Sequence, residues 1–181
     1  MLENKRNFLL KTHSMNLKNI KNNFYINLLI IILVFLLDRI SKIYVIYLAD
    51  KKNSFDLFSS EFLNINLIWN DGIAFGLFSL NEKYLYNTLT MFIGLVIMLI
   101  LFLLITNRGL KQFSLVLVFA GAIGNLYDRI FYKAVPDFID FHIGEFHWFI
   151  FNVADIFITF GVIFMILLEL IGNNKSDNEK I

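Results

Sequence analysis

Four stretches of the chain are apolar over a length that suits a membrane crossing. A transmembrane helix needs about 20 mostly apolar residues, since each residue advances the helix by about 1.5 Å and the hydrocarbon core is about 30 Å thick. The sequence predicts such spans at about residues 25–48, 84–105, 113–131 and 148–171. The pattern therefore predicts an all-α membrane protein with four transmembrane helices.

The long connection between the first two spans has a shorter period. From Phe62 to Asn70, apolar residues mostly alternate with asparagines, which is typical of a strand with one buried face. The segment then enters a turn with two glycines, Asn70-Asp71-Gly72-Ile73-Ala74-Phe75-Gly76. We therefore expect a small extracytoplasmic β-sheet between helices 1 and 2, resting on the outer membrane surface.

Composition supports the membrane assignment. Of the 181 residues, 57% are hydrophobic and 17% charged, whereas a soluble domain is nearer half apolar and a quarter charged. These values exclude a disordered or collagen-like chain. The absence of cysteine excludes a thiol nucleophile, a thiolate metal site and a disulfide-bonded secreted domain. The formal net charge of +1 is no indication of a nucleic-acid partner.

The positions of lysine and arginine predict the orientation. Nine of them flank the spans on one side, in the N-terminal segment, the tight loop after the second span and the tail, against four in the two opposite loops. Because such residues accumulate on the cytoplasmic side, both termini are predicted to be cytoplasmic. The expected parts are an N-terminal extension at 1–23, a four-helix domain at 24–171 and a tail at 172–181. Met15 is a second candidate start, and the first span is expected to be an uncleaved anchor.

Charged and amide side chains interrupt three of the four predicted spans. They are Asp38, Arg39 and Lys42 in the first, Asn125, Asp128 and Arg129 in the third, and Asn152 and Asp155 in the fourth. Such residues are costly inside a bilayer, so each is a functional candidate, with an interfacial ion pair as the structural alternative. Within each span, a spacing of three or four residues places members of the group on one helix face. Gly121 and Gly124 would let another helix approach the third span closely.

The helical rise places the three groups at one depth. Asp38 lies about 20 Å into the first span, Asn125 about 18 Å into the third, and Asp155 about 10 Å below the outer end of the fourth. With cytoplasmic termini, all three groups are expected near the outer leaflet. The alternative function is a small proton-coupled transporter component, in which Asp38, Asp128 and Asp155 relay protons. Such a pathway would need polar groups in both halves of the membrane.

Asp155 has the least structural explanation, because no basic residue lies near it in the sequence. A second carboxylate is available from Asp137 and Asp140, in the connection between the third and fourth spans. Pro136 disfavours helix before it, so we expect Asp137 on a stiff, non-helical segment. Two carboxylates at low dielectric cannot both ionise, and such a pair can act as base and acid, as in an aspartic protease. The residues alone leave open whether Asp155 pairs with Asp137, Asp140 or Asp128.

Other catalytic groups fit less well. Ser41 and Ser114 lie in or near spans without a histidine within sequence reach, which disfavours Ser-His catalysis. His142, Glu145 and His147 match no helical metal-ligand spacing, and their aromatic surroundings favour packing at the membrane interface. The sequence indicates neither a metal nor an organic cofactor.

Five motifs, in this order, resemble those of the bacterial lipoprotein signal peptidases, or signal peptidase II. They are Asp38-Arg-Ile-Ser-Lys42, Asn70-Asp-Gly72-Ile-Ala-Phe75-Gly76, Gly121-Ala-Ile-Gly124-Asn125-Leu-Tyr-Asp128-Arg129, Val135-Pro-Asp137-Phe138-Ile-Asp140-Phe and Phe151-Asn152-Val-Ala154-Asp155. The resemblance covers about Tyr25 to Ile171. Pro136 and Phe149 depart from it, standing where an aliphatic residue and often a proline are expected, and we expect them to alter loop stiffness only.

The resemblance implies a fold of four transmembrane helices with a small extracytoplasmic sheet. It implies that Asp137 and Asp155 are catalytic and that substrate-binding or supporting roles fall to Asp38, Lys42, Asn70, Gly72, Asn125, Asp128, Arg129 and Asn152. The implied reaction removes the signal peptide of a prolipoprotein just before a cysteine that carries a diacylglyceryl group. We also expect a monomer among the lipids of the bacterial cytoplasmic (inner) membrane, with its active site near the outer leaflet.

Overall fold

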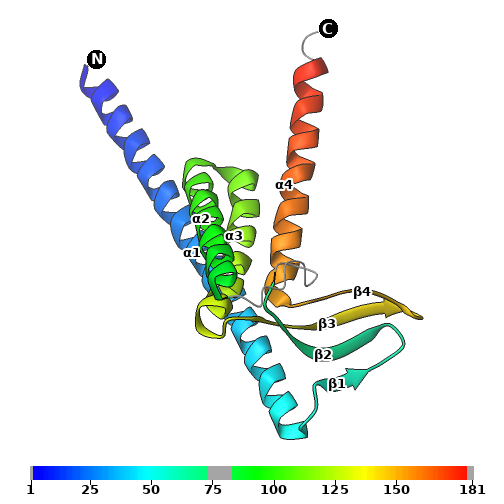
Figure 1. The fold of residues 1–181 in the computed structure, drawn as a ribbon. Helices are drawn as coiled ribbons and strands as arrows, with labels where there is room; N and C mark the ends of the chain where they lie inside the picture. Colours follow the sequence, from blue (N-terminus) through cyan, green and yellow to red (C-terminus); the bar gives the residue numbers. More distant parts are fainter. Residues whose placement is uncertain (1, 73–82, 179–181) are drawn as a thin grey trace.

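Long helices and one small sheet make up the computed structural model, which describes residues 2–72 and 83–178, with side chains described from 23 to 72 and from 84 to 171. The elements, in chain order, are α1 (Leu2–Lys52), β1 (Asp56–Ser59), β2 (Leu63–Asn70), α2 (Lys83–Thr106), α3 (Gly109–Phe131), β3 (Val135–Ile143), β4 (Phe146–Phe151) and α4 (Val153–Asn178). Figure 1 shows the sheet projecting from one end of the helices. The expected turn over residues 73–76 lies outside the described residues.

Three helices in the described part of the chain are long and apolar enough to cross a membrane. They comprise Tyr84–Thr106, Gly109–Phe131 and Val153–Ile171, which correspond to the second, third and fourth predicted spans. The fourth begins at Val153, so the predicted start at Trp148 is wrong. Residues 148–151 belong to β4, and this apolar strand continues directly into the apolar helix, so hydropathy alone cannot separate the two.

The first predicted span, residues 25–48, lies within the much longer helix α1. This helix already includes residues 2–23, and its N-terminal part extends beyond α2 and α3 (Figure 1). Its apolar side chains are largely exposed, as Leu29, Leu33 and Leu37 illustrate. Exposed apolar side chains of this kind suit a helix that faces lipid.

Helix α3 lies at the centre, packed against α1, α2 and α4. Small residues allow this packing: a Cβ added to Gly124 would lie 2.6 Å from a carboxylate oxygen of Asp38, and one added to Gly121 would overlap the backbone carbonyl of Ala154. The close helix approach predicted from these two glycines is therefore confirmed. It brings the polar residues of α1 and α3 against the first turn of α4.

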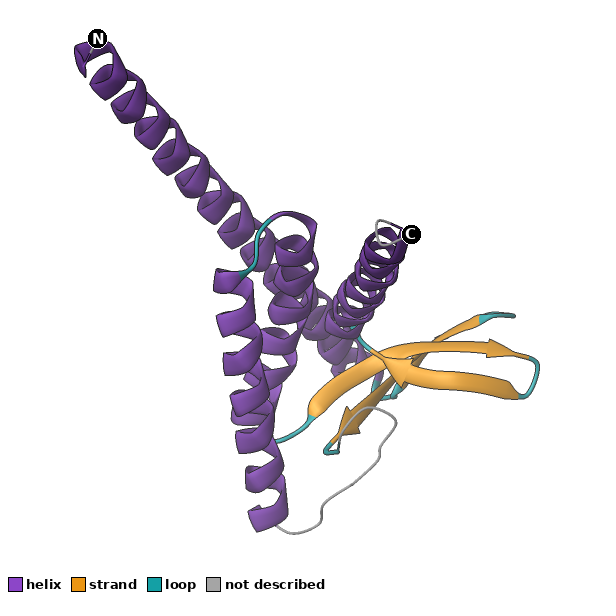
Figure 2. Cartoon of the chain, turned by 90° about the horizontal axis from the view of Figure 1, so that it is seen from above, coloured by secondary structure: helices purple, strands orange, loops and turns teal. Residues whose placement is uncertain are grey.

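The sheet is antiparallel throughout, with strand order β1-β2-β3-β4. The strand predicted at residues 62–70 is present as β2, and Asp137 lies on a non-helical segment, β3, as expected. The expected position of the sheet, between helices 1 and 2, is only half right, because β3 and β4 come from the connection between α3 and α4. Gly144, with a φ of +57°, turns the chain between them. Figure 2 shows the strands extending away from the helices to one side.

The sheet is attached to the C-terminal part of α1. Val45 and Ala49 of that helix form a buried cluster with Leu57, Leu67 and Phe138, from the first three strands. Phe138 directly follows Asp137. The cluster therefore holds the backbone on which this carboxylate is mounted.

Candidate active site

Asp137 lies on β3 with its side chain buried, at 4% exposure. Its two carboxylate oxygens accept hydrogen bonds from two side-chain amides: Asn70 Nδ2 donates to Oδ2 at 2.9 Å, and Asn152 Nδ2 donates to Oδ1 at 2.6 Å. The amide of Asn70 is in turn oriented by the backbone N–H of Gly72, which donates to Asn70 Oδ1 at 3.0 Å. The carboxylate is thus held between the end of β2 and the start of α4.

Asp155 lies in the first turn of α4, in a reciprocal cap with Asn152. Asn152 Oδ1 accepts the backbone N–H of Asp155 at 3.2 Å, and Asp155 Oδ2 accepts the backbone N–H of Asn152 at 3.1 Å. This is the arrangement of a capping box, with Asn152 as the N-cap and Asp155 three residues later. This cap was not predicted, although Asn-x-x-Asp before an apolar run is a sequence signal for it.

Asn152 therefore joins the two carboxylates. Its Oδ1 is engaged by α4, which leaves its Nδ2 to donate to Asp137. The alternatives left open by the sequence have other partners. Asp140 accepts hydrogen bonds from His147 Nδ1 at 2.9 Å and Asn64 Nδ2 at 3.3 Å, whereas Asp128 is bound by cations on α1. Of the three candidates, the structure links Asp137 to Asp155 through one amide.

Burial raises the pKa of Asp137 to about 6, and the nearby charge of Asp155 acts in the same direction. The amides of Asn70 and Asn152 oppose this rise, because they donate to the ionised carboxylate and stabilise it. A carboxyl group that keeps its proton to about pH 6 beside a second carboxylate is suited to acid and base roles in one reaction.

Lys42 orders the polar side chains of α1 and α3 that lie next to Asp155. Its side chain is 1% exposed, and its Nζ donates to Asp38 at 2.9 Å, Asn125 Oδ1 at 2.9 Å and Asp128 at 2.7 Å. An ammonium group has three donors and no acceptor, so it fixes which end of the Asn125 amide faces it. The Nδ2 of Asn125 consequently faces Asp155 and donates to its Oδ1 at 2.8 Å.

The buried charges of Asp38, Arg39 and Lys42 on α1 and Asp128 on α3 neutralise one another. Asp38 and Asp128, both fully buried, are each bound by Lys42 and by Arg39, whose guanidinium also lies 4.8 Å from the ring centre of Tyr127. A carboxylate oxygen of Asp38 also accepts the backbone N–H of Ala154 at 3.0 Å. That N–H is in the first turn of α4, so Asp38 helps to fix the start of this helix beside Asp155.

Arg129 has a different environment from Arg39. Its guanidinium is buried and donates to two backbone carbonyls, those of Gly72 at 2.9 Å and Asn125 at 3.3 Å. No carboxylate of the described residues lies within ion-pair distance of it, and its Nε has no partner among them. Tyr86 OH of α2 donates to its backbone carbonyl at 3.2 Å, a contact that no sequence motif indicated.

His142 on β3 and His147 on β4, which could be considered as metal ligands, contact each other across the two strands. The rings of His142 and His147 stack with their centres 4.9 Å apart, and His147 is bound to Asp140. Across the part of the chain with described side chains, no group of three potential metal ligands occurs.

Helices suited to a membrane end beside two aspartates that both hydrogen-bond Asn152, an arrangement that fits the class of membrane enzymes. A sequence model described as Signal peptidase (SPase) II matches residues 30–171. The chain therefore belongs to the signal peptidase II family, a family of aspartic peptidases, and it removes signal peptides from lipoproteins. This assignment favours the peptidase over the proton-coupled transporter.

Individual relatives agree with the family. The chain is 54% identical to the lipoprotein signal peptidase of Pelagibacter ubique, over 92% of this chain and 99% of that protein. It is 37% identical to the lipoprotein signal peptidase of Anaplasma marginale, over 83% and 88%. A solved bacterial membrane enzyme, determined in meso at 2.3 Å resolution, superposes with a TM-score of 0.66 at 30% identity, over 82% of this chain and 90% of that one.

Proposed function

We propose that Asp137 and Asp155 are the catalytic pair and that they hydrolyse the peptide bond just before a cysteine that carries a diacylglyceryl group. The observation that carries this proposal is the Asn152 side chain, which hydrogen-bonds both aspartates and belongs to the cap of α4. Its Nδ2 donates to the carboxylate of Asp137 and its backbone N–H donates to the carboxylate of Asp155, so one residue binds both carboxyl groups. The diacylglyceryl substrate is what the motif resemblance implies.

The pair is proposed to act with one proton between its members. As a water oxygen bonds to the scissile carbonyl carbon, the ionised carboxylate takes a proton from the water and the other gives its proton to the carbonyl oxygen. The resulting diol collapses as the carbon–nitrogen bond breaks. One diol hydroxyl returns its proton to the ionised carboxylate, the protonated one gives its proton to the amine nitrogen, and the pair again carries one proton. The raised pKa of Asp137 makes it the proposed proton carrier.

The neighbouring side chains are proposed to bind and orient. Asn125 and Asn152 hold the two carboxylates through donated hydrogen bonds. Arg129, buried and bound only to backbone carbonyls in the described structure, is placed to donate to a peptide carbonyl of the substrate. Asn70 and Gly72 connect Asp137 to Arg129 and so link the carboxylate to this donor. Lys42, Asp38 and Asp128 are proposed to support the site from behind.

The test of this function is cleavage of a defined substrate by the purified protein. A prolipoprotein with a diacylglyceryl cysteine is incubated with the wild type, and the masses of the products are measured by mass spectrometry. The expected result is a free signal peptide and a lipoprotein that begins at the modified cysteine. Cleavage at another bond, or equal cleavage of the unlipidated precursor, would contradict the proposal.

The pH dependence provides a second test. Because activity requires the proton of Asp137, kcat/KM is expected to fall as the pH rises through about 6. Asn70 stabilises the ionised carboxylate, so Asn70→Ala raises the pKa of Asp137 further and moves this fall to higher pH, by about half a pH unit or more. Asn66→Ala is the control, since Asn66 is on the same strand and donates no hydrogen bond to Asp137. If the fall in kcat/KM of Asn70→Ala occurred at the same or a lower pH than in the wild type, Asp137 would not be the group whose proton the reaction requires.

We also propose the membrane arrangement: four transmembrane helices with residues 25–48 of α1 as the first, and cytoplasmic parts at 1–23 and 172–181. Both termini would face the cytoplasm of a bacterial inner membrane, and the active site would lie near the outer leaflet of a monomer surrounded by lipid. Asp155 supports this depth, because it is in the first turn of a helix that continues as an apolar span. The excess of lysine and arginine on the opposite side supports the orientation.

Cysteine labelling tests the orientation, and the cysteine-free chain makes single variants unambiguous. Glu145→Cys, in the β3–β4 turn, is expected to react with a membrane-impermeant maleimide in intact cells or spheroplasts. Arg108→Cys, between α2 and α3, is expected to react only after the membrane is opened. The reverse pattern would place the site at the inner leaflet.

A further inference from the structure

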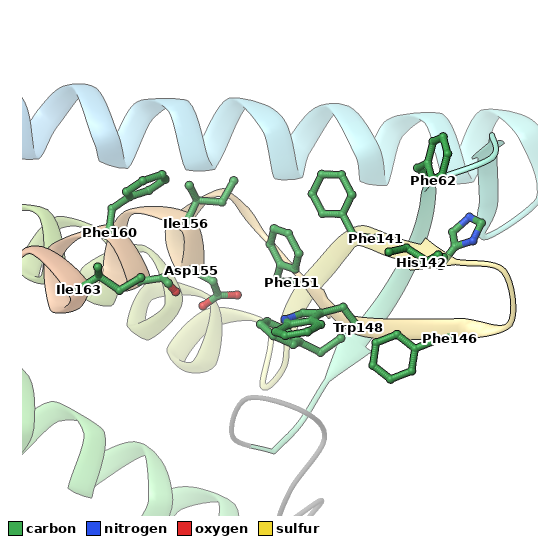
Figure 3. A pocket seen from close by; sticks show the side chains of 13 residues that line it. Phe62, Phe141, His142, Phe146, Trp148, Phe151, Asp155, Ile156, Phe160 and Ile163 are labelled. Atoms are coloured by element: carbon green, nitrogen blue, oxygen red, sulfur yellow. The ribbon is translucent and has the colours of Figure 1, made fainter.

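Helix α2 contains none of the five motifs. An apolar groove of about 650 Å³ opens beside Asp155, between α4 and the β3–β4 hairpin, and Figure 3 shows aromatic side chains of the hairpin along one side of it. Of the described residues that line this groove, none belongs to α2. Among the described side chains of α2, only Tyr86 forms a hydrogen bond with another element. Any direct influence of α2 on the site through a polar side chain therefore falls to Tyr86.

Tyr86 is buried, although its neighbours in the first turn of α2 face outward. Its exposure is 7%, whereas Tyr84 is 85% exposed and Leu85 48%. A buried tyrosine hydroxyl needs a hydrogen-bond partner, because it has left the water that would otherwise bind it. The hydroxyl of Tyr86 donates to the backbone carbonyl of Arg129 at 3.2 Å. The side chain is thus directed at one backbone atom of α3.

The carbonyl of Arg129 lies in the last turn of α3. The last four carbonyls of a helix have no N–H four residues further along within the helix. The carbonyl of Asp128 accepts the N–H of Tyr132 at 2.7 Å, but the next N–H in this series is that of Lys133, which lies beyond the helix with a φ of +60°. The hydroxyl of Tyr86 supplies a donor at this point. It thereby ties the end of α3 to the start of α2.

Arg129 binds the chain on both sides of the connection from β2 to α2. Its carbonyl accepts the hydroxyl of Tyr86, and its Nη2 donates to the backbone carbonyl of Gly72 at 2.9 Å. Gly72 follows the end of β2, and Tyr86 belongs to the first turn of α2. The guanidinium holds Gly72 more firmly when the backbone of Arg129 is itself fixed, and the bond from Tyr86 fixes it.

Two further hydrogen bonds lead from Gly72 to Asp137. The backbone N–H of Gly72 donates to Asn70 Oδ1 at 3.0 Å, and Asn70 Nδ2 donates to Asp137 Oδ2 at 2.9 Å. Hydrogen bonds weaken steeply when their angle is lost, and a misplacement of about 1 Å in an active site can lower the rate by about 100-fold. A displacement of Arg129 would therefore reach the amide that holds the Asp137 carboxylate.

We propose that Tyr86 is a positioning residue for the peptidase reaction. Its hydroxyl fixes the backbone of Arg129, and through Gly72 and Asn70 this holds the carboxylate of Asp137. The inference rests on the proposed function, and it adds a residue of α2 that lies outside the five motifs. Tyr86 acts through its neighbours and touches neither the aspartates nor the scissile bond.

The test removes one oxygen atom. Tyr86→Phe keeps the buried ring and loses only the donor to Arg129, and Tyr84→Phe is the matched control, because Tyr84 is in the same turn and exposed. The pH dependence of kcat/KM is measured on a diacylglyceryl prolipoprotein. Tyr86→Phe is expected to lower kcat/KM about tenfold. It is also expected to move the fall in kcat/KM to higher pH, because a weaker bond from Asn70 stabilises the ionised form of Asp137 less. Tyr84→Phe is expected to keep the wild-type value and pH profile.

A double variant tests the path from Tyr86 to Asp137. In the Asn70→Ala background the contacts of Gly72 no longer reach Asp137, so adding Tyr86→Phe is expected to shift the pH profile no further. A shift of the same size in both backgrounds would mean that the effect reaches Asp137 by another path, and it would overturn the proposal. The melting temperature of each variant in detergent is measured in parallel, so that activity is expressed per folded protein.

The outcomes separate this role from the underlying function. If the wild type cleaves the substrate and Tyr86→Phe keeps the wild-type kcat/KM and pH profile, the positioning role is wrong while the peptidase function stands. If Tyr86→Phe loses activity only in proportion to its unfolded fraction, with the wild-type pH profile, the hydroxyl supports the fold alone and the proposal is overturned. If the wild type cleaves no diacylglyceryl substrate, the proposed function fails, and the positioning role fails with it.

Discussion

Changing Asp137 or Asp155 to Asn is expected to lower kcat on a diacylglyceryl prolipoprotein by about 10³-fold or more, because each change removes a proton donor or acceptor from the proposed pair. The asparagine side chain has nearly the same shape, so the loss should appear in kcat with little change in substrate affinity. The measurement is a single-turnover cleavage assay with a fixed amount of lipidated substrate.

Asp140→Asn is the matched control for this experiment. Asp140 is on the same strand as Asp137 and is also buried, at 2% exposure, but its carboxylate is bound to His147 and Asn64. We expect Asp140→Asn to retain most of the wild-type kcat. Undiminished cleavage by Asp137→Asn or Asp155→Asn would contradict the assignment of the catalytic pair. If Asp140→Asn lost as much activity as the other two variants, the losses would reflect damage to the strand and not the removal of a catalytic group.

Lys42→Met is expected to destabilise the protein by about 3–5 kcal/mol, because it leaves two buried carboxylates without one of their cations. Asp38 and Asp128 are fully buried, and both are bound by the Lys42 ammonium. The change is measured as the loss of thermal stability of the purified protein in detergent. The same change also frees the Asn125 amide to rotate away from Asp155, so kcat should fall in the fraction that remains folded.

Lys111→Met provides the comparison for stability. Lys111 pairs with Glu169 at 2.8 Å, but half of each side chain or more is exposed, so water screens this ion pair and it is expected to contribute little to stability. Equal thermal stability of Lys42→Met and Lys111→Met would mean that the buried cluster does not support the site. A large loss in Lys42→Met alone would support it.

Much of the fold could be predicted from the apolar pattern. Three of the predicted spans coincide with helices suited to a membrane, and the alternation at 62–70 corresponds to β2. The boundary at Trp148 could not be predicted, because β4 and α4 form one unbroken apolar stretch in the sequence. The membership of β3 and β4 in the sheet was also missed, since pairs such as Asn64 with Asp140 join residues far apart in the chain.

The candidate site was predictable as a set of residues and unpredictable as an arrangement. Asp155 was singled out as an ionisable residue in an apolar span, and Asp137 as a carboxylate held by Pro136 on a non-helical segment. The residues alone did not distinguish Asp137 from Asp140, since both follow the same proline and lie three positions apart. In the structure, Asp137 reaches Asn152, whereas Asp140 reaches His147.

By itself, the sequence determined that this protein belongs in a membrane and which charged and amide residues interrupt its spans. The length of an apolar stretch and the cost of a charge within it are local properties of the chain. Its motifs also indicated the family. Only the tertiary structure decided which carboxylates Asn152 binds, how Lys42 orients Asn125 toward Asp155, and that Asp155 lines an apolar groove. These features depend on contacts among α1, α3, α4 and the sheet, and such contacts are set by packing and strand register, which no single segment of sequence contains.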